Sequence, residues 1–263
     1  MKPPRLTLSN SLWLVFAAVY FFLPLYATAE FSLETGPSQH GFDAYTAILS
    51  DPEFKDGLRL SLQLAVETVI LSLVLLVPTV YWFNLKLPGL RPAMDFIAIL
   101  PFVVPPVALA VGLFRVFQPV TWLISTPQVL VLAYVVLTLP FTYRSLDAGM
   151  RAINLRTLTE AAQSVGAGGL TILLRVILPN VRSAMLSATF LGFTLVLGEY
   201  TMASLLIFNT FAVYVERKGV ETAHPAAALA IISFILTWAA MMGFLLLGRR
   251  LGPRQQTQIG TTR

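Results

Sequence analysis

The stretch TEAAQSVGAGGLTILLRVILPN, residues 159–180, lies between two apolar stretches of the chain. It is too polar to cross a membrane, and its pattern is too regular for a casual linker. Small residues and three glycines fill its first half, aliphatic residues recur through its second half, and Pro179 stands near its end. What such a segment can do depends on the solvent around it, which the composition of the whole chain indicates.

The composition is that of an integral membrane protein. Hydrophobic residues make up 56% of the 263 residues and charged residues only 12%, and a soluble core of this size would need many more charges to cover its surface. Cysteine is absent, which excludes a disulfide framework, a thiol nucleophile and a thiolate metal site. His40 and His224 stand alone in the sequence and do not have the spacing of metal ligands.

A helix that crosses a bilayer needs about 20 mostly apolar residues. Five stretches clearly meet this requirement, and a sixth, residues 129–141, is short and follows Pro127. The six predicted spans are residues 11–29, 61–83, 96–117, 129–141, 185–208 and 226–248. The sequence therefore predicts an all-α membrane protein with six transmembrane helices.

The first of these stretches has a second interpretation. Lys2 and Arg5 precede the apolar run, and Ala27 and Ala29 at its end are placed like the small residues of a signal-peptide cleavage site. The run is longer than the usual apolar core of a signal peptide, which favours a retained helix.

Loop charges orient the predicted spans. With the N-terminus inside, thirteen of the 18 Lys and Arg residues fall in inside segments, as expected because basic residues gather in short cytoplasmic loops. The first outer loop, residues 30–59, carries six acidic residues. We therefore expect both termini in the cytoplasm. The net charge of +5 is explained by this orientation and gives no reason to expect a nucleic-acid partner.

With this orientation, residues 159–180 lie in the longest cytoplasmic loop, residues 144–182. Thr157 and Glu160 form an [ST]-x-x-[DE] pair, which predicts a capped helix that starts near Thr157. The helix should stop near Gly166, where the chain can leave helical geometry, and a second amphipathic helix should end at Pro179. Local chemistry leaves two functions open: docking into a groove of another protein, or a plain connection between two spans.

The segment resembles the cytoplasmic loop signature of the permease subunits of ABC importers. That signature is Glu-Ala-Ala, three residues, Gly, nine residues, then an aliphatic residue, any residue and Leu-Pro. It is matched with every spacing kept by Glu160, Ala161, Ala162, Gly166, Val176, Leu178 and Pro179. The likeness in helix layout extends over residues 58–250, and the polyamine branch of these permeases is the most similar in appearance.

The resemblance implies a type I ABC importer permease fold and a role in ATP-driven uptake. It implies that Glu160 orients a coupling helix, that Ala161 and Ala162 allow close approach to an ATPase, that Gly166 makes the turn, and that Leu178 and Pro179 anchor the return to the bilayer. It also implies that the chain has three parts. These are an N-terminal helix and outer loop in residues 1–57, a permease core with the coupling loop in residues 58–250, and a cytoplasmic tail in residues 251–263.

The resemblance further implies partners. ATP would be used by a cytoplasmic ABC ATPase dimer, because this chain has no G-x-x-x-x-G-K-[ST] loop and is expected to bind no cofactor itself. A second permease subunit, a copy or a homologous chain, would complete the path, and an external substrate-binding protein would deliver the cargo. The expected location is the lipid bilayer of a bacterial or archaeal cell (inner) membrane.

Polar and broken places within the predicted spans are candidates for the translocation path or its gate. Glu67 and Glu199 are carboxylates in apolar surroundings, where charge is costly unless it faces a cavity or a partner. Tyr200 follows Glu199, and Pro105 and Pro106 should break the span 96–117. The alternatives are interhelical hydrogen bonds for the carboxylates and ordinary packing for the proline kink.

Two acidic residues in the spans suit a cationic cargo, and the likeness to the polyamine branch points to spermidine or putrescine. Sulfate, molybdate and ferric iron are the alternative cargoes, because relatives of this type carry them. A membrane transporter without ATPase coupling is the alternative function class, but it should show an inverted repeat or paired intramembrane charges, and neither is evident.

Overall fold

A computed structural model describes residues 8–36 and 39–251 of the chain. Within these residues the protein is helical, apart from a small ribbon of two antiparallel strands, β1 (Glu34–Gly36) and β2 (Gln39–His40). The predicted all-α membrane fold is confirmed. Lys2, Arg5 and residues 252–263 of the predicted tail lie outside the described residues.

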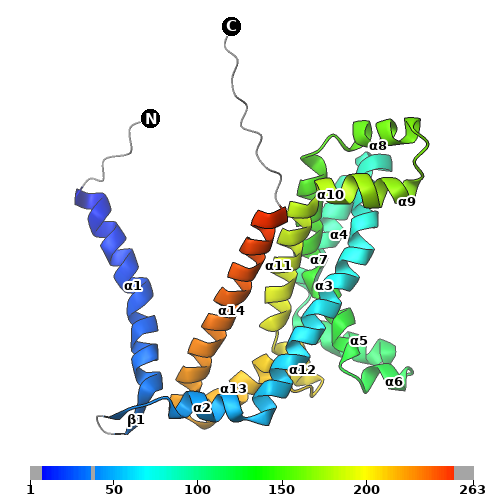
Figure 1. The fold of residues 1–263 in the computed structure, drawn as a ribbon. Coiled ribbons are helices and arrows are strands. Elements are labelled where there is room, and N and C mark those ends of the chain that lie inside the picture. Colours follow the sequence, from blue (N-terminus) through cyan, green and yellow to red (C-terminus); the bar gives the residue numbers. More distant parts are fainter. Residues whose placement is uncertain (1–7, 37–38, 252–263) are drawn as a thin grey trace.

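The centre of the molecule is a bundle of three helices, α3 (Pro52–Lys86), α7 (Gln128–Arg151) and α11 (Arg182–Leu197), which pack closely on one another. α14 (Ala223–Leu251) lies against α11, and α1 (Leu8–Leu33) lies apart from the bundle and meets α14 (Figure 1). A glycine allows α7 and α11 to cross closely, since a Cβ at Gly149 of α7 would collide with the Cβ of Ala184 on α11.

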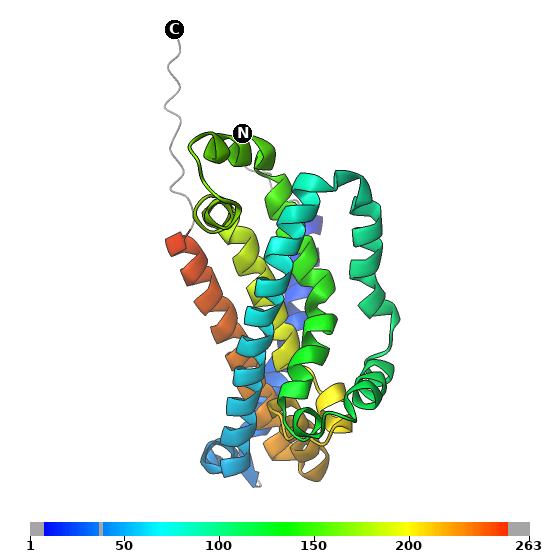
Figure 2. The ribbon, with the colours of Figure 1, turned by 90° about the vertical axis from the view of Figure 1, so that its right-hand side faces the viewer.

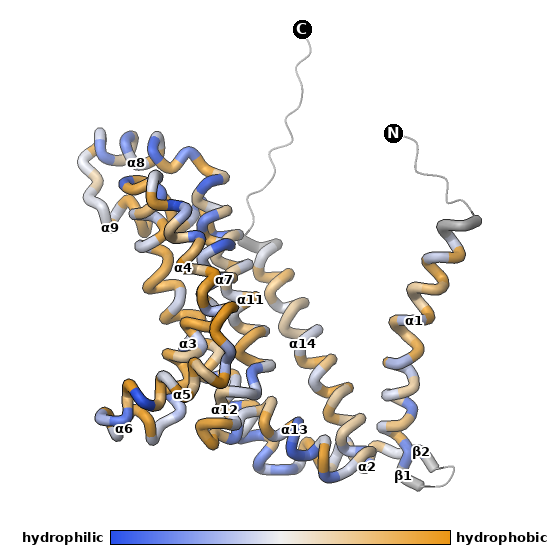
Figure 3. Tube along the Cα trace, turned by 180° about the vertical axis from the view of Figure 1, so that it is seen from behind, coloured by the Kyte–Doolittle hydropathy of each residue, from blue (hydrophilic) through white to orange (hydrophobic). Residues whose placement is uncertain are grey.

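Four helices, residues 11–33, 52–86, 128–151 and 223–248, are long and apolar enough to cross a membrane, and two bent helix pairs bring the total to as many as six. Apolar residues cover the long helices along their length, and hydrophilic residues gather at both ends of the molecule (Figure 3). This distribution fits a bilayer around the middle of the bundle.

The first bent pair is α4 (Arg91–Val103) and α5 (Pro106–Phe117), which follow the short 3₁₀ turn η1 (Pro88–Leu90). They meet at 98°, and Figure 2 shows both helices on one flank of the bundle. Pro105 and Pro106 have no N–H to continue the hydrogen bonds of α4, so the last of these bonds runs from Val104 N to Leu100 O. The predicted break in span 96–117 is confirmed. α6 (Thr121–Ile124) follows α5.

The segment between α7 and α11 forms one end of the molecule, which we call the loop end (Figure 1). It contains α8 (Leu155–Ser164), α9 (Gly169–Ile172), the π-helical turn η2 (Leu173–Ile177) and α10 (Leu178–Asn180). The second bent pair forms here, because residues 169–180 meet α11 at 78°. α1 begins and α14 ends at the loop end.

The opposite end holds the strands and the helices α2 (Asp43–Ser50), α12 (Thr201–Leu205) and α13 (Phe211–Glu221) (Figure 1). Asp51 caps α3 there by accepting from Glu53 N at 2.9 Å, and it accepts from the Tyr214 hydroxyl of α13 at 2.8 Å. The hydrogen bond from Tyr214 holds the pKa of Asp51 below its usual value. Arg217 and Glu53 form an ion pair beside it, so α13 is fastened to the start of α3.

Three predicted boundaries are wrong. Residues 61–83 are the middle part of α3 and residues 129–141 are the first part of α7, so residues 144–151 of the predicted loop are still helical. Charge misled the prediction, because Asp147 and Arg151 pair across one helical turn and keep α7 regular. The predicted span 185–208 ends early, at Leu197, because the chain unwinds at Gly198.

Candidate functional site

The first half of the loop is a capped helix that begins two residues earlier than the sequence indicates. Asn154 is the N-cap of α8, and its side chain accepts from Thr157 N at 3.4 Å. The predicted capping box of Thr157 and Glu160 is therefore wrong. Glu160 instead accepts from Arg156 Nε at 2.9 Å, one turn away on the exposed face. Asparagine is a preferred N-cap residue, so Asn154 was the available signal.

The end of α8 confirms the predicted turn at Gly166. Gly166 has φ +82°, a left-handed conformation that glycine adopts without steric cost. Gly166 N donates to Gln163 O at 2.9 Å and Ala167 N donates to Ala162 O at 3.0 Å, which is the Schellman pattern of a helix end. A Cβ at Gly166 would meet nothing within 4 Å, so only the backbone requires the glycine.

The two alanines of the signature face opposite ways. Ala162 is buried and belongs to a core cluster at the loop end, whereas Ala161 is exposed. Only Ala161 can therefore allow close approach of another protein in this conformation. Ala162 instead seats α8 on the rest of the loop.

The second half of the loop runs through a π-helical turn rather than a regular helix. Val176 lies in this turn, and the helix continues one residue past Pro179 to Asn180 before the chain bends at Val181. The observed helix end at Asn180 thus lies one residue past the end predicted at Pro179. π-Turns often mark functional positions in helices.

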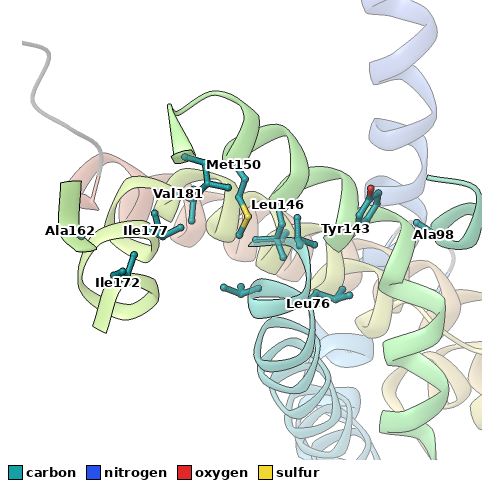
Figure 4. Packing of buried hydrophobic residues seen from close by; sticks show 13 residues of the cluster. Leu76, Ala98, Tyr143, Leu146, Met150, Ala162, Ile172, Ile177 and Val181 are labelled. Carbon is teal, nitrogen blue, oxygen red and sulfur yellow. The ribbon is translucent and has the colours of Figure 1, made fainter. Parts of the chain in front are cut away.

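The loop is packed on its inner side, and its outer side exposes several apolar residues among polar and charged ones. Ala162, Ile172, Ile177 and Val181 of the loop are buried together with residues of α3, α4 and α7 (Figure 4). On the outer side Val165 is 82% exposed, and Leu170 and Leu174 are exposed as well. We call Ala161, Val165, Leu170 and Leu174 the loop ridge. A rigid apolar ridge is a surface suited to a protein partner.

Glu199 lies at the opposite end of the molecule and is held by donors of this chain. Its side chain is buried, 8% exposed. It accepts from the Tyr134 hydroxyl at 2.9 Å, from Met202 N at 2.8 Å and from Ala203 N at 3.3 Å. The carboxylate thus caps α12 and ties it to α7, as the interhelical alternative proposed. Sequence reasoning missed Tyr134, since no local pattern links positions so far apart.

The other path candidates are not gathered at one place. Glu67 is half-buried on α3 and accepts from Gln63 Nε2 at 2.8 Å. Tyr200 lines a cleft of about 340 Å³ between α11, α13 and α14, whose lining does not include Glu199. Pro105 and Pro106 lie exposed at the break between α4 and α5. Among the described residues no group of three or more His, Asp and Glu side chains could hold a metal ion.

Residues 88–256 match the family described as binding-protein-dependent transport system inner membrane component. The chain belongs to this family of ABC importer permeases. The match begins at η1 and covers both bent helix pairs and the loop.

Curated permeases of different cargo are similar to this member of the family. The molybdenum transport system permease protein ModB of Azotobacter vinelandii is 29% identical over 206 residues, which cover 70% of this chain and 91% of that one. The spermidine/putrescine transport system permease protein PotB of Escherichia coli (strain K12) is 28% identical over 182 residues, 62% of this chain and 65% of that one. A probable sulfate transport system permease protein, cysT of Nephroselmis olivacea, is 28% identical over 213 residues.

Solved structures share the fold of this permease. A chain of a bacterial ABC transporter involved in the import of the acidic polysaccharide alginate superposes with a TM-score of 0.72 at 18% identity, over 92% of this chain and 94% of that one. A chain of the MetNI methionine ABC transporter in an inward facing conformation superposes with a TM-score of 0.60 at 17% identity, over 75% of this chain and 95% of that one.

Proposed function

We propose that this permease subunit couples a separate cytoplasmic ABC ATPase dimer to transport through the loop ridge. The observation that carries the proposal is the loop itself. Its turn at Gly166 presents exposed apolar residues on one end of the molecule, and its inner side is packed on the helices of the bundle. A partner that presses on the ridge would move these helices with it.

The same proposal assigns the remaining partners. A second permease subunit, a homologous chain or a second copy, lies against this one in the cell membrane and completes the translocation path. An external substrate-binding protein docks at the opposite end, where α2 and α13 present exposed charged residues, among them Asp43 and Glu216. The loop end then faces the cytoplasm, in agreement with the charge distribution of the sequence.

We propose a polyamine as the cargo, with molybdate and sulfate as the competing choices that the relatives raise. The half-buried carboxylate of Glu67 favours a cation in the path, whereas Glu199 is engaged within the chain. Uptake of labelled spermidine, molybdate and sulfate by cells with and without the gene separates these choices. Spermidine uptake that falls in a Glu67→Gln variant supports the cation; uptake of an oxyanion instead excludes it.

The coupling proposal is tested with Gly166→Lys beside Gly168→Lys. Both glycines are exposed with nothing within 4 Å of an added Cβ, but only Gly166 has a positive φ. We expect both variants to insert into the membrane. We expect only Gly166→Lys to impair transport, because the left-handed conformation at this helix end costs an L-residue about 1 kcal/mol or more. Gly166→Asn, whose side chain tolerates the left-handed region, should keep most of the activity.

Partner capture completes the test. A mild-detergent pull-down of the tagged native chain should retain an ATPase and a second permease, and the Gly166→Lys variant should lose the ATPase. If the native chain is recovered alone under conditions that preserve other membrane complexes, the chain is not coupled to an ATPase.

A further inference from the structure

α4 is the helix that leads into the break at Val104 and Pro105, beyond which α5 runs at 98° to it. Its main packing partner in the bundle is α7. One turn after Asp95, Ala98 of α4 is 2% exposed and belongs to the same core cluster as Tyr143 of α7 (Figure 4). A shift of α7 therefore reaches the break through this contact.

A hydrogen bond joins the two helices at this contact. The Tyr143 hydroxyl donates to Asp95 Oδ1 at 3.0 Å. The ring of Tyr143 is 3% exposed and packs in the core cluster, while Asp95 lies on the exposed side of α4. A hydrogen bond to a carboxylate is directional and stronger than one between neutral groups, so it fixes the rotation of α4 as well as its distance from α7.

The next turn of α7 is tied to α3. Asp147 accepts from Asn84 Nδ2 of α3 at 2.9 Å and pairs with Arg151 at 2.6 Å. At this end of α7, Asp147 thus contacts α3 and Tyr143 contacts α4. Of these two contacts, only the one between Tyr143 and Asp95 leads toward the proline break.

The core cluster connects this contact to the loop. It runs from Ala162, Ile172, Ile177 and Val181 of the loop, through Met150 and Leu146 of α7, to Tyr143 and Ala98 (Figure 4). Close-packed interiors transmit displacement rather than absorb it. The buried side of the loop and α4 are therefore the two ends of one packed cluster.

We infer that the hydrogen bond from Tyr143 to Asp95 is the link through which displacement of the loop turns α4 and moves the break at Val104 and Pro105. Tyr143 and Asp95 are positioning residues in this mechanism. The inference rests on the coupling function proposed above.

The test uses the purified complex of the permease with its partners in proteoliposomes, and it measures transport and ATP hydrolysis in the same sample. Tyr143→Phe keeps the buried ring and removes the donor; Asp95→Ala removes the acceptor. We expect each to lower the cargo carried per ATP by about fivefold or more, with ATP hydrolysis and thermal stability close to native. Asp95→Asn keeps an acceptor oxygen for a weaker, neutral hydrogen bond and should lose clearly less coupling than Asp95→Ala.

Asn84→Ala is the matched control. Asn84 donates to another carboxylate of α7, that of Asp147 at 2.9 Å, but it joins α7 to α3 and not to α4. Its loss should leave the cargo carried per ATP unchanged. The double variant Tyr143→Phe/Asp95→Ala should be no worse than either single variant, since both remove one interaction.

Three results would overturn the inference. The first is native coupling in Tyr143→Phe. The second is a loss in Asp95→Asn as large as in Asp95→Ala, which would assign the effect to the charge. The third is a loss of transport that follows a matching loss of thermal stability. Failure of the coupling proposal itself would give a different result from these three. In that case the native permease would retain no ATPase, and cargo carried per ATP could not be measured for any variant.

Discussion

At the scale of single residues, two helix ends of the same geometry use different side chains. Two residues after α8 the chain turns at Gly166 with φ +82°, and two residues after α12 it turns at Ile207 with φ +62°. In both, the amide of the following residue reaches back across the last turn, from Ala167 to Ala162 O and from Phe208 to Ala203 O. An isoleucine is unfavourable in this backbone region because its Cβ crowds the neighbouring carbonyl. Ile207 is also 89% exposed, so burial does not compensate for the strain.

Replacing Ile207 by glycine should therefore stabilise the protein. The left-handed conformation costs an L-residue about 1 kcal/mol or more, and relief of about 1 kcal/mol raises Tm by about 2–4 °C in a chain of this size. The measurement is thermal unfolding in detergent. Ser204→Gly, a half-buried position inside α12, is the control and should lower Tm, since glycine weakens a helix interior. An unchanged or lower Tm in Ile207→Gly would show that no strain is stored there.

At the scale of helices, the sequence predicted which elements exist better than where they end. Hydrophobicity located every long helix, and the prolines at 105 and 106 located the break. The predicted helix boundaries were wrong where charged residues belong to helices. Asp147 and Arg151 were assigned to the loop, but they form an ion pair on α7. A hydropathy value describes the transfer of one side chain from water to an apolar phase. It carries no information about an oppositely charged residue one helical turn away.

The crossing of α7 and α11 depends on a small residue in each helix. A Cβ at Gly149 would overlap the Cβ of Ala184. Both atoms are attached directly to the backbone, so neither can move aside without a shift of its helix. Gly149→Ala should therefore push the helices apart and lower stability by about 1–3 kcal/mol, the usual cost of overpacking. Thermal unfolding of the full chain in detergent measures this loss.

A compensating variant distinguishes overlap from any other effect of the alanine. Gly149→Ala combined with Ala184→Gly restores the space and should recover most of the lost Tm. Gly243→Ala on α14, where an added Cβ meets nothing within 4 Å, should be neutral or slightly stabilising. A double variant as unstable as Gly149→Ala would contradict the overlap.

At the scale of the whole molecule, the candidate site divides into a part that sequence could predict and a part that it could not. The loop is local: its turn at Gly166 was predicted because the residues that make it are neighbours in the chain. Glu199 is not local, since its partner Tyr134 comes from another helix 65 positions away. The contact of Tyr143 with Asp95 also joins two helices, 48 positions apart, and a single sequence shows no sign of it.

The two ends of the molecule should lie on opposite sides of the membrane, and the chain is well suited to a direct test because it has no cysteine. Val165 of the loop is 82% exposed and Val220 of α13 is 80% exposed, so a single cysteine at either position would be open to reagents. In sealed right-side-out vesicles, a membrane-impermeant maleimide should label Val220→Cys at once and Val165→Cys only after the membrane is permeabilised.

Bound ATPase adds a second readout to the same variants. If the loop ridge is the docking surface, the ATPase should shield Val165→Cys in permeabilised vesicles and leave labelling of Val220→Cys unchanged, because contact with a partner excludes water from the side chain. Stripping the ATPase from the vesicles should then restore labelling at position 165. Labelling of Val165→Cys in intact vesicles would reverse the orientation, and equal labelling with and without the ATPase would place its docking surface elsewhere than the ridge.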